Sequence, residues 1–372
     1  MAKVLQEQQS RQGDSSIFRH VIDSTLRAEP LSSPLHTVAA GIDEYFLKDP
    51  SFMAPISVLR ERTTPLGPLG VGGYDVVHLH GLAGTLHKKD RDALQHARKI
   101  VWTLHDMNPF TGACHYSLGC EKFSSGCTGC PAVRKIARPT VAQALQLKAQ
   151  WVSQLKDLTL VAPSSWLATQ AMASNIFVGR HVVVQANPIN PLFCEDPDPA
   201  DRAGESFSIV AVAQNLDDPL KNIESTVSAF HQARKRNPEM TLNLVGRGGQ
   251  EFKHPGITMH GELTALQLKS LFAHTDALVV SSLAENAPLV IAEAASQGVL
   301  PVVSCVGGMP EMVQQVGEGK SFAEPRELVA LLLELASAHS SRSPADRSKL
   351  RASALSTFSP QSVTTAYGKV YS

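Results

Sequence analysis

The chain has 372 residues with 34 basic and 34 acidic side chains, so its formal net charge is zero. This balance excludes nucleic acid as a default partner, because phosphate binding needs clustered Lys and Arg. At roughly 100–200 residues per domain the length predicts two domains, and 43% apolar residues favour large buried sheets. No apolar run reaches the roughly 18–20 residues of a membrane span, and Met1–Gln12 lacks the apolar centre of a signal peptide. We therefore expect a soluble cytoplasmic protein whose six cysteines are reduced thiols or metal ligands.

Short apolar runs alternate with stretches of helical periodicity along the chain. The Val-rich runs predict strands covered on both faces, at Asp75–His80, Ile100–Leu104, Leu158–Ala162, Val182–Gln185, Ser208–Val212, Thr241–Val245, Ala277–Val280 and Pro301–Val303. The periodic stretches predict helices at Thr140–Leu155, Trp166–Ser174, Ile223–Arg234, Ala265–His274, Leu289–Ser296 and Arg326–Ala338. Thr264 and Ser165 are expected to cap the helices that follow them. The alternation predicts an α/β protein with parallel sheets and right-handed crossovers.

The densest turn signals lie near the middle of the chain, at Asn187–Pro199. This segment holds four prolines and opens on the turn-like Asn-Pro-Ile-Asn. We therefore place the interdomain linker there, with a first domain over residues 1–187 and a second over 188–359.

Two glutamates with seven residues between them follow the predicted strand Ala277–Val280. Glu285 lies in the loop, Pro288 suits the first position of the next helix, and Glu293 falls about a turn and a half into that helix. Two lone glutamates are most simply explained as solvated acids. The strand–loop–helix context favours a ligand site instead, because open α/β sheets bind ligands beyond the carboxyl ends of their strands.

Backbone amides add an anion-binding feature to the same loop. The N–H groups of Asn286, Ala287 and Leu289 are expected to cluster at the helix N-terminus, which attracts anions. With these amides facing a phosphate, the two glutamates could hold the hydroxyl groups of a sugar and of a ribose.

Four segments together resemble one known family, the retaining GT-B glycosyltransferases of family 4 (glycosyltransferase group 1). Ser282–Ala294 is similar to the family's Glu-x7-Glu signature, and Gly298–Val313 to the strand, Gly-Gly turn and helix that follow it. Leu244–Gly248 resembles the family's strand-to-glycine turn beside the nucleotide base. Asn187–Phe193 resembles its interdomain segment, with Pro188 in place of a glycine.

The resemblance extends from about Tyr74 to Val313 and implies a fold. The expected fold is α/β of the GT-B type, with two doubly wound Rossmann-like domains facing across a cleft. Residues 1–187 would form the acceptor-side domain and 188–359 the donor-binding domain. A C-terminal helix over 360–372 would cross back to the first domain.

The family usually carries an arginine and then a lysine after the first strand of the donor domain, both facing the donor diphosphate. Lys221 corresponds to the lysine, while Asn215 stands at the arginine position. Losing one cation could cost about 2–4 kcal/mol of stabilisation of the leaving diphosphate. Asn215 still donates a neutral hydrogen bond, and Arg247 is a candidate to compensate. For Lys221 the alternative is a solvated lysine before a helix.

Two predicted strands in the first half end in His78-Leu79-His80 and in His105-Asp106. His105 corresponds residue for residue to a histidine that the family places near the donor sugar and the acceptor. Beside a glycosyl diphosphate this histidine could stabilise charge or orient the acceptor hydroxyl. The alternative is a loop histidine held by hydrogen bonds. His80 and Asp106 are further acceptor-side candidates.

The N-terminus matches the family less well. The family's first strand leads into a Gly-Gly loop that meets the acceptor and the phosphate. Here Lys3–Gln6 is the candidate strand, and only Gly13 is available as the acceptor-side glycine.

Four of the six cysteines lie close together in the sequence, namely Cys114, Cys120, Cys127 and Cys130. The last two have zinc-knuckle spacing, while the first two are further apart than the usual ligand pair. One interpretation is a structural zinc held by all four cysteines; two disulfides and plain thiols are the alternatives. The stretch Trp102–Pro131 resembles a branch of family 4 with a Cys-rich loop, which does not say what the loop binds.

The resemblance implies a retaining, metal-independent transferase that moves a sugar from a UDP- or GDP-sugar to a polysaccharide, glycolipid or metabolite. Glu293 would hold the ribose, and His105, Glu285 and Lys221 would act on the reacting groups. Gly246 and Arg247 would lie beside the base. No cofactor is expected for catalysis. Lipid-linked acceptors would bring the protein to the inner face of the membrane.

Two other functions compete with this one. A different GT-B enzyme, such as a phosphorylase or an epimerase, is disfavoured by the absence of an obvious pyridoxal lysine and by the Glu-x7-Glu pair respectively. A non-catalytic GT-B-shaped binding subunit is favoured by Asn215 and by the single glycine at Gly13.

Overall fold

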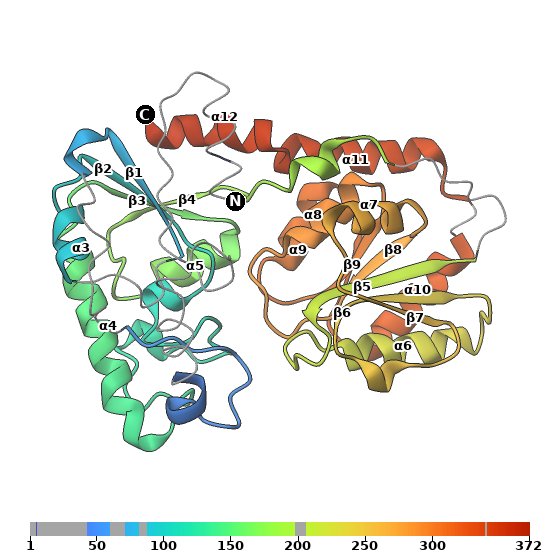
Figure 1. The fold of residues 1–372 in the computed structure, drawn as a ribbon, viewed down its shortest axis with the longest axis horizontal. Coiled ribbons are helices and arrows are strands. Elements are labelled where there is room, and N and C mark those ends of the chain that lie inside the picture. The colour runs from blue at the N-terminus through green and yellow to red at the C-terminus, as the bar shows by residue number, and fades with distance from the viewer. Residues whose placement is uncertain (1–4, 6–42, 60–70, 82–87, 198–205, 339–340) are drawn as a thin grey trace. The chain divides into compact units, whose positions relative to one another are not determined.

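The computed structural model describes residue 5 and residues 43–59, 71–81, 88–197, 206–338 and 341–372 (Figure 1). These residues form two compact units. Ala186–Thr365 belong to unit 1, while residues 43–185 and Ala366–Ser372 belong to unit 2. No described helix is both long and apolar enough to cross a membrane.

Unit 2 contains a parallel sheet in the order β1-β2-β3-β4. Its strands are β1 (Val76–His80), β2 (Lys99–Thr103), β3 (Leu158–Ala162) and β4 (His181–Val184). Its α-helices are α3 (Lys88–Leu94), α4 (Arg138–Ser153) and α5 (Ser165–Met172). The central strands β2 and β3 are buried over most of their length, which explains their apolar sequences.

Short helical turns occupy the long connections of unit 2. They are η1 (Asp43–Leu47), η2 (Val71–Gly73), η3 (Asn108–Phe110), η4 (Lys122–Ser124) and η5 (Lys135–Ala137). Antiparallel bridges join Lys48 to Val133 and Ile56 to Cys114. The Cys-rich loop is therefore tied to an earlier part of the chain, and its buried side chains continue the core beneath β2.

Unit 1 contains a six-stranded parallel sheet in the order β10-β9-β8-β5-β6-β7. Its strands are β5 (Ser208–Asn215), β6 (Thr241–Arg247), β7 (Ile257–Gly261), β8 (Ala277–Val280), β9 (Leu300–Ser304) and β10 (Lys320–Phe322). The chain builds outward from β5 through β6 and β7, and then returns to pair β8 with the other side of β5. The direction of winding thus reverses between β5 and β8.

α-Helices lie between most consecutive strands of unit 1, as is usual for parallel pairing, while β6 and β7 are joined through the turn η7 (Gln250–Phe252) alone. The helices are α6 (Ile223–Arg234), α7 (Ala265–Ala273), α8 (Leu289–Ser296), α9 (Met309–Val316), α10 (Pro325–Ala338) and α11 (Pro344–Phe358), with the further turn η6 (Pro191–Cys194). Thr264 begins α7 with a capping box, in which its hydroxyl accepts from the N–H of Gln267 and the Gln267 side chain accepts from Thr264 N.

The last helix, α12 (Pro360–Tyr371), ends in unit 2. Its last turns are hydrogen-bonded to the sheet of that unit. Tyr367 Oη lies 2.8 Å from Thr103 Oγ1 of β2, and Tyr371 Oη lies 2.8 Å from His78 Nδ1 of β1. Lys99 Nζ also donates to the carbonyl of Tyr371 at 3.2 Å.

The parallel α/β architecture predicted from the sequence is confirmed, and each strand and helix predicted between Asp75 and Ala338 is present within a few residues of its expected ends. The edge strands β7 and β10 were not predicted. Two predicted helix starts are wrong. Ser164, not Ser165, caps α5, because its hydroxyl accepts from Leu167 N at 3.2 Å. Pro288 is the residue before α8 and not its first residue.

Candidate active site

Two loops of unit 1 are joined beyond the carboxyl ends of β5 and β8, where the winding of the sheet reverses. Ser281 Oγ donates to the carbonyls of Asn222 (2.7 Å) and Lys221 (3.2 Å). Leu283 N donates to Leu220 O at 2.8 Å, which adds a backbone link between the loops. Such a reversal is where open α/β sheets bind ligands, so the joined loops form the floor of a candidate site.

Lys221 and Glu285, both predicted as site residues, form an ion pair between these loops. Lys221 Nζ contacts Glu285 Oε1, and Ser282 Oγ donates to the same oxygen at 3.4 Å. The Glu285 side chain is only 9% exposed, while that of Lys221 is 30% exposed. The ammonium therefore holds a buried carboxylate and also remains accessible to an anionic ligand.

Gly307 supports the Glu285 loop by direct backbone contact. It has a φ of 58°, and a Cβ placed on it would lie 1.6 Å from the carbonyl oxygen of Glu285. Beside it, Ser304 Oγ donates to Ser282 O at 2.6 Å. The first glycine of the predicted Gly-Gly turn thus has a specific task, because any side chain there would displace Glu285.

Glu293 lies in α8 and is half-buried. Burial raises the pKa of its carboxyl group to about 7, although the N–H of Asn190 donates to it and acts in the opposite direction. At neutral pH the group is therefore poised between its two protonation states. A ligand that donates hydrogen bonds, such as the diol of a ribose, would favour the charged state.

The predicted amide donors lie in the segment that leads into α8. Asn286 is buried, and Ala287 and Leu289 are half-buried. α8 begins at Leu289, and Pro288 has no N–H. The backbone N–H groups next to the start of the helix are therefore those of Asn286, Ala287 and Leu289.

Asn215, at the end of β5, is exposed and forms a turn with its own side chain. Its Oδ1 accepts from Asp217 N at 3.2 Å, and Asp217 Oδ1 in turn accepts from Gly249 N at 2.7 Å. Gly246 packs closely against β5, since a Cβ on it would lie 2.0 Å from Ala213 O. The predicted strand-to-glycine turn is thus fixed against the loop that carries Asn215.

Arg247, the residue predicted to compensate for Asn215, forms an ion pair in which its Nε lies 3.2 Å from Glu262 Oε1. Both side chains are largely exposed. They line a pocket of 430 Å³ beyond the ends of β6 and β7, together with Gly246, Gly248 and His260. The pocket therefore lies at the turn that the sequence placed beside a nucleotide base.

In unit 2 the structure brings together the histidines of β1 and of the loop after β2. His80 Nδ1 lies 3.1 Å from His105 Nε2, and the two rings are stacked. Burial lowers the pKa of His78, His80 and His105, and that of His78 falls to about 3. These rings are therefore neutral at pH 7 and act as hydrogen-bond partners, not as cations.

Asp106 is held by two groups, one on each carboxylate oxygen. Its Oδ2 lies 2.6 Å from His115 Nδ1, and its Oδ1 accepts from Asn108 N at 2.7 Å. His115 Nε2 in turn lies 2.9 Å from Ser57 Oγ. Burial alone would raise the pKa of Asp106, but the nearby His115, these hydrogen bonds and His105 hold it below the usual value.

Several participants were not predicted from the sequence. Ser281 and Asn222 join the loops of unit 1, and His115 and Thr103 hold polar groups in unit 2. A small polar residue directly after a strand was the one available signal for Ser281. Gly13 lies outside the described residues, as does the candidate strand Lys3–Gln6 apart from Leu5, which is helical and not in a strand as predicted.

All four clustered cysteines are free thiols, and three of them are buried. No group of three or more His, Cys, Asp or Glu side chains is arranged to hold a metal ion anywhere in the described part of the chain. No disulfide joins these thiols, so the disulfide interpretation is not supported. The zinc and the plain-thiol interpretations both stay predictions.

The thiols find partners within the loop itself. Cys127 Sγ accepts from Gly112 N at 3.3 Å. Cys114 is hydrogen-bonded to Cys130, and this bond, opposed by burial and reinforced by backbone N–H groups, lowers the pKa of Cys130 to about 7. The same contact raises the pKa of Cys114.

Comparison with known proteins gives a family match for part of unit 1. Residues 206–338, which lie in unit 1 and include Lys221, Glu285 and Glu293, match the family described as glycosyl transferases group 1. A putative colanic acid biosynthesis glycosyl transferase, WcaC of Escherichia coli, is 27% identical over 237 residues, covering 62% of this chain. The match spans 57% of the length of WcaC.

Solved structures show the same fold. Sucrose-phosphate synthase from Thermosynechococcus elongatus superposes with a TM-score of 0.58 at 19% identity, covering 80% of this chain and 73% of that one. HepE of Anabaena, solved in complex with UDP, superposes with a TM-score of 0.57 at 18% identity, covering 81% and 79%. The predicted α/β GT-B fold, with two Rossmann-like sheets, is confirmed.

Proposed function

We propose that this chain, which carries a glycosyl transferases group 1 domain in a GT-B fold, is a retaining glycosyltransferase that uses a nucleotide diphosphate sugar. The observation that carries the proposal is the Lys221–Glu285 pair at the reversal of the unit 1 sheet, within the segment that matches the family. Residues 188–359 would bind the donor and residues 1–187 the acceptor, with the helix of 360–372 completing the acceptor-side domain.

Each donor group has a chemically suitable partner in unit 1. Glu293, once ionised, would accept hydrogen bonds from the ribose, and Glu285 from the sugar hydroxyls. Lys221 would exchange part of its contact with Glu285 for a contact with the diphosphate. The amides of Asn286, Ala287 and Leu289 would bind the diphosphate as well. The pocket lined by Gly246 and Arg247 would take the base.

The reaction that fits these groups places little covalent chemistry on the protein. The bond between the anomeric carbon and the diphosphate oxygen breaks, and a bond from the acceptor oxygen to the same face of that carbon forms. The acceptor proton passes to the departing phosphate, whose charge Lys221 and the amides stabilise without a metal ion. In the acceptor-side domain His105, with His80 and Asp106 beside it, would orient the acceptor hydroxyl.

UDP is the donor nucleotide that we favour, because HepE was solved with UDP and shares the fold. A GDP-sugar is the alternative. The name of WcaC points to a polysaccharide acceptor, which is our first choice over a glycolipid or a small metabolite. We place the protein in the cytoplasm, where a lipid-linked acceptor would be met at the inner face of the membrane.

A non-catalytic binding subunit is the second candidate, and Asn215 favours it. The side chain at this position is neutral and exposed, and it is engaged in its own turn. A transferase of this fold with one cation fewer would stabilise the leaving diphosphate less well.

Thermal unfolding with a panel of UDP-, GDP-, ADP- and dTDP-sugars distinguishes the two candidates. At about 100 times its dissociation constant, a true donor adds about 2.7 kcal/mol to the free energy of unfolding. We expect one nucleotide to stabilise the wild-type chain and to lose its effect in Glu293→Ala and Lys221→Ala. A folded chain that responds to none of them would overturn the proposal in favour of the binding subunit.

A further inference from the structure

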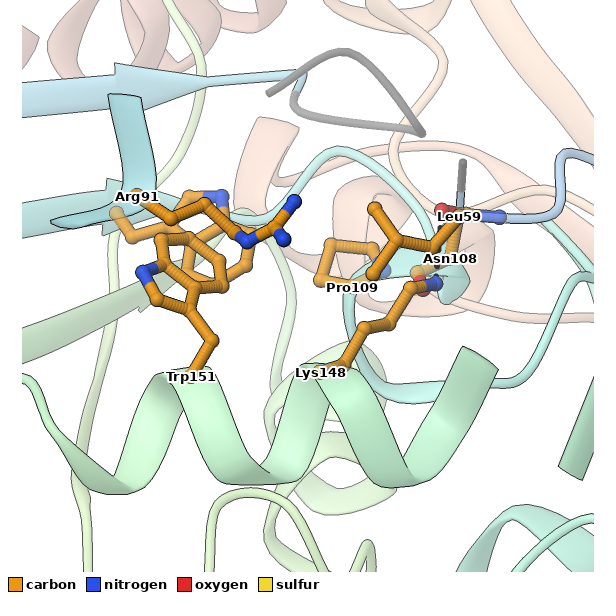
Figure 2. Close-up of a pocket in the computed structure, with 7 residues that line it drawn as sticks. Leu59, Arg91, Asn108, Pro109, Lys148 and Trp151 are labelled. Atoms are coloured by element: carbon orange, nitrogen blue, oxygen red, sulfur yellow. Dashed lines mark hydrogen bonds between the residues drawn. The ribbon is translucent and has the colours of Figure 1, made fainter. Parts of the chain in front are cut away.

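A buried lysine in unit 2 has a set of contacts that the proposed chemistry does not yet use. Lys148 lies on α4 and is 6% exposed. Its Nζ donates to Asn108 O (2.6 Å), Asn108 Oδ1 (3.2 Å) and Thr111 O (2.9 Å). An ammonium group has three N–H donors, so this side chain is fully satisfied. Figure 2 shows it extending from the helix toward Asn108.

The position is an unusual one for a lysine. Lysine is almost never fully buried unless it is paired, and burial lowers the pKa of Lys148 to about 8. The cavity beside it has a volume of 20 Å³, which is room for one water and for no substrate. The ammonium therefore acts on the two residues that it contacts and not on a ligand in that cavity.

Asn108 connects Lys148 to the loop after β2. Its Nδ2 donates to Ser57 O (2.9 Å) and Ala113 O (2.6 Å), while its Oδ1 accepts from Lys148. Both polar ends of the side chain are therefore fixed. Its backbone N–H donates to Asp106 Oδ1 at 2.7 Å. Lys148 thus fixes Asn108, and Asn108 in turn fixes Asp106.

Asp106 is the neighbour of His105 in the chain and acts on it electrostatically. Burial lowers the pKa of the His105 ring, and the Asp106 carboxylate opposes this effect. The second oxygen of Asp106 is held by His115, which is itself held by Ser57 Oγ. The orientation of the carboxylate beside His105 is therefore set by Asn108 on one side and His115 on the other.

We propose that Lys148 is a positioning residue for the histidine pair: through Asn108 it fixes Asp106 and the segment that carries His105. The effect of Lys148 on catalysis rests on the proposed function, in which His105 orients the acceptor. The effect of Lys148 on the position of His105 does not depend on that function.

The test replaces Lys148 by methionine, which keeps the length of the side chain and removes all three donors. Leu145→Ala is the matched control, because Leu145 is buried on the same helix in the apolar core and loses packing only. Nuclear magnetic resonance of the histidine Cε1–H groups in the full chain reports on His105 and His80 without any substrate. Signals are assigned with His105→Gln and His80→Gln.

We expect Lys148→Met to shift the His105 signal and to lower its pKa, because Asp106 is no longer held beside it. Leu145→Ala should leave both unchanged at a comparable loss of thermal stability. If Lys148→Met gives the same His105 signal and pKa as the control, Lys148 has a structural role only and the proposal is wrong. Should Lys148→Met not fold, Lys148→Leu takes its place, since it also removes all three donors, and the same comparison decides.

Kinetics separate this inference from the proposed function. In the proposed function donor binding belongs to unit 1, so nucleotide-induced stabilisation should survive in Lys148→Met while kcat falls about tenfold, which corresponds to about 1.4 kcal/mol in activation free energy. A wild-type chain that binds no nucleotide contradicts the proposed function, whereas the His105 spectrum still decides the role of Lys148. An unchanged kcat with a shifted His105 signal would show that Lys148 positions His105 without contributing to catalysis, which would overturn the catalytic part of this proposal.

Discussion

Lys221 and Glu285 form an ion pair although 64 residues separate them in the chain. The pair joins the loop after β5 to the loop after β8, and these strands are neighbours because the sheet reverses its winding between them. The cation expected on a diphosphate and the carboxylate expected on a sugar are thus in direct contact before any ligand is bound.

Removing one partner of this pair should cost stability as well as donor binding. Lys221→Met leaves the Glu285 carboxylate buried without its cation. We expect a loss of about 1–3 kcal/mol, below the range for fully buried pairs because Lys221 is partly exposed. Urea unfolding measures the loss. The double variant Lys221→Met/Glu285→Leu should recover most of it while remaining unable to bind the donor, and a double variant no more stable than the single one would contradict this account.

Gly307→Ala should disrupt the Glu285 loop selectively. The added Cβ would meet the Glu285 carbonyl at 1.6 Å, and the positive φ adds strain, so we expect a loss of about 2 kcal/mol or more together with donor binding. Gly368→Ala in α12 is the control. A Cβ there has no heavy atom within 4 Å, and we expect a small gain of about 0.5–1 kcal/mol. Equal effects of the two substitutions in thermal unfolding would refute the backbone-contact argument.

Glu293 should make stability depend on pH near neutrality. Its pKa rises from the ordinary 4.5 to about 7 in the folded chain, so the folded state holds the proton more tightly than the unfolded state. Its favourable contribution is therefore fully present below pH 4.5 and is lost as pH rises through 7, by up to about 3 kcal/mol. Glu293→Gln should remove this dependence and stabilise the ligand-free chain at pH 8.

Donor binding should show the opposite dependence on pH, because a ribose diol donates to the ionised carboxylate. We expect the affinity for the nucleotide to rise between pH 6 and pH 8, with proton release that calorimetry in two buffers detects. An affinity independent of pH in this range would count against Glu293 as the ribose ligand.

The cysteine loop should be insensitive to metal removal. The thiols are partnered within the loop, and no described group is arranged to hold a metal ion. We expect purified protein to contain well below one equivalent of zinc and to keep its melting temperature after dialysis against a chelator. Stoichiometric zinc, or a large drop in melting temperature with the chelator, would show that the loop rearranges around a metal.

The local pattern of the sequence determined the elements and part of the site. Val-rich runs predicted the central strands, because strands buried on both faces must be apolar throughout, whereas the half-exposed edge strands β7 and β10 carried no such signal. Thr264 was predicted as the cap of α7, because a cap and the amide it binds lie within four residues of the chain. Glu285 and Glu293 were predicted as site residues because strand, loop and helix are continuous in the chain.

Only the tertiary structure decided which polar groups meet. Lys148 and Asn108 are 40 residues apart and His78 and Tyr371 are 293 apart, and no local pattern distinguishes such residues from surface ones. The pairing of Lys221 with Glu285 likewise follows from strand order, and the state of the thiols from how the loop folds back on Gly112. Local periodicity records which faces are apolar, but the long-range contacts that shift a pKa or fix a carboxylate depend on the order in which the strands assemble.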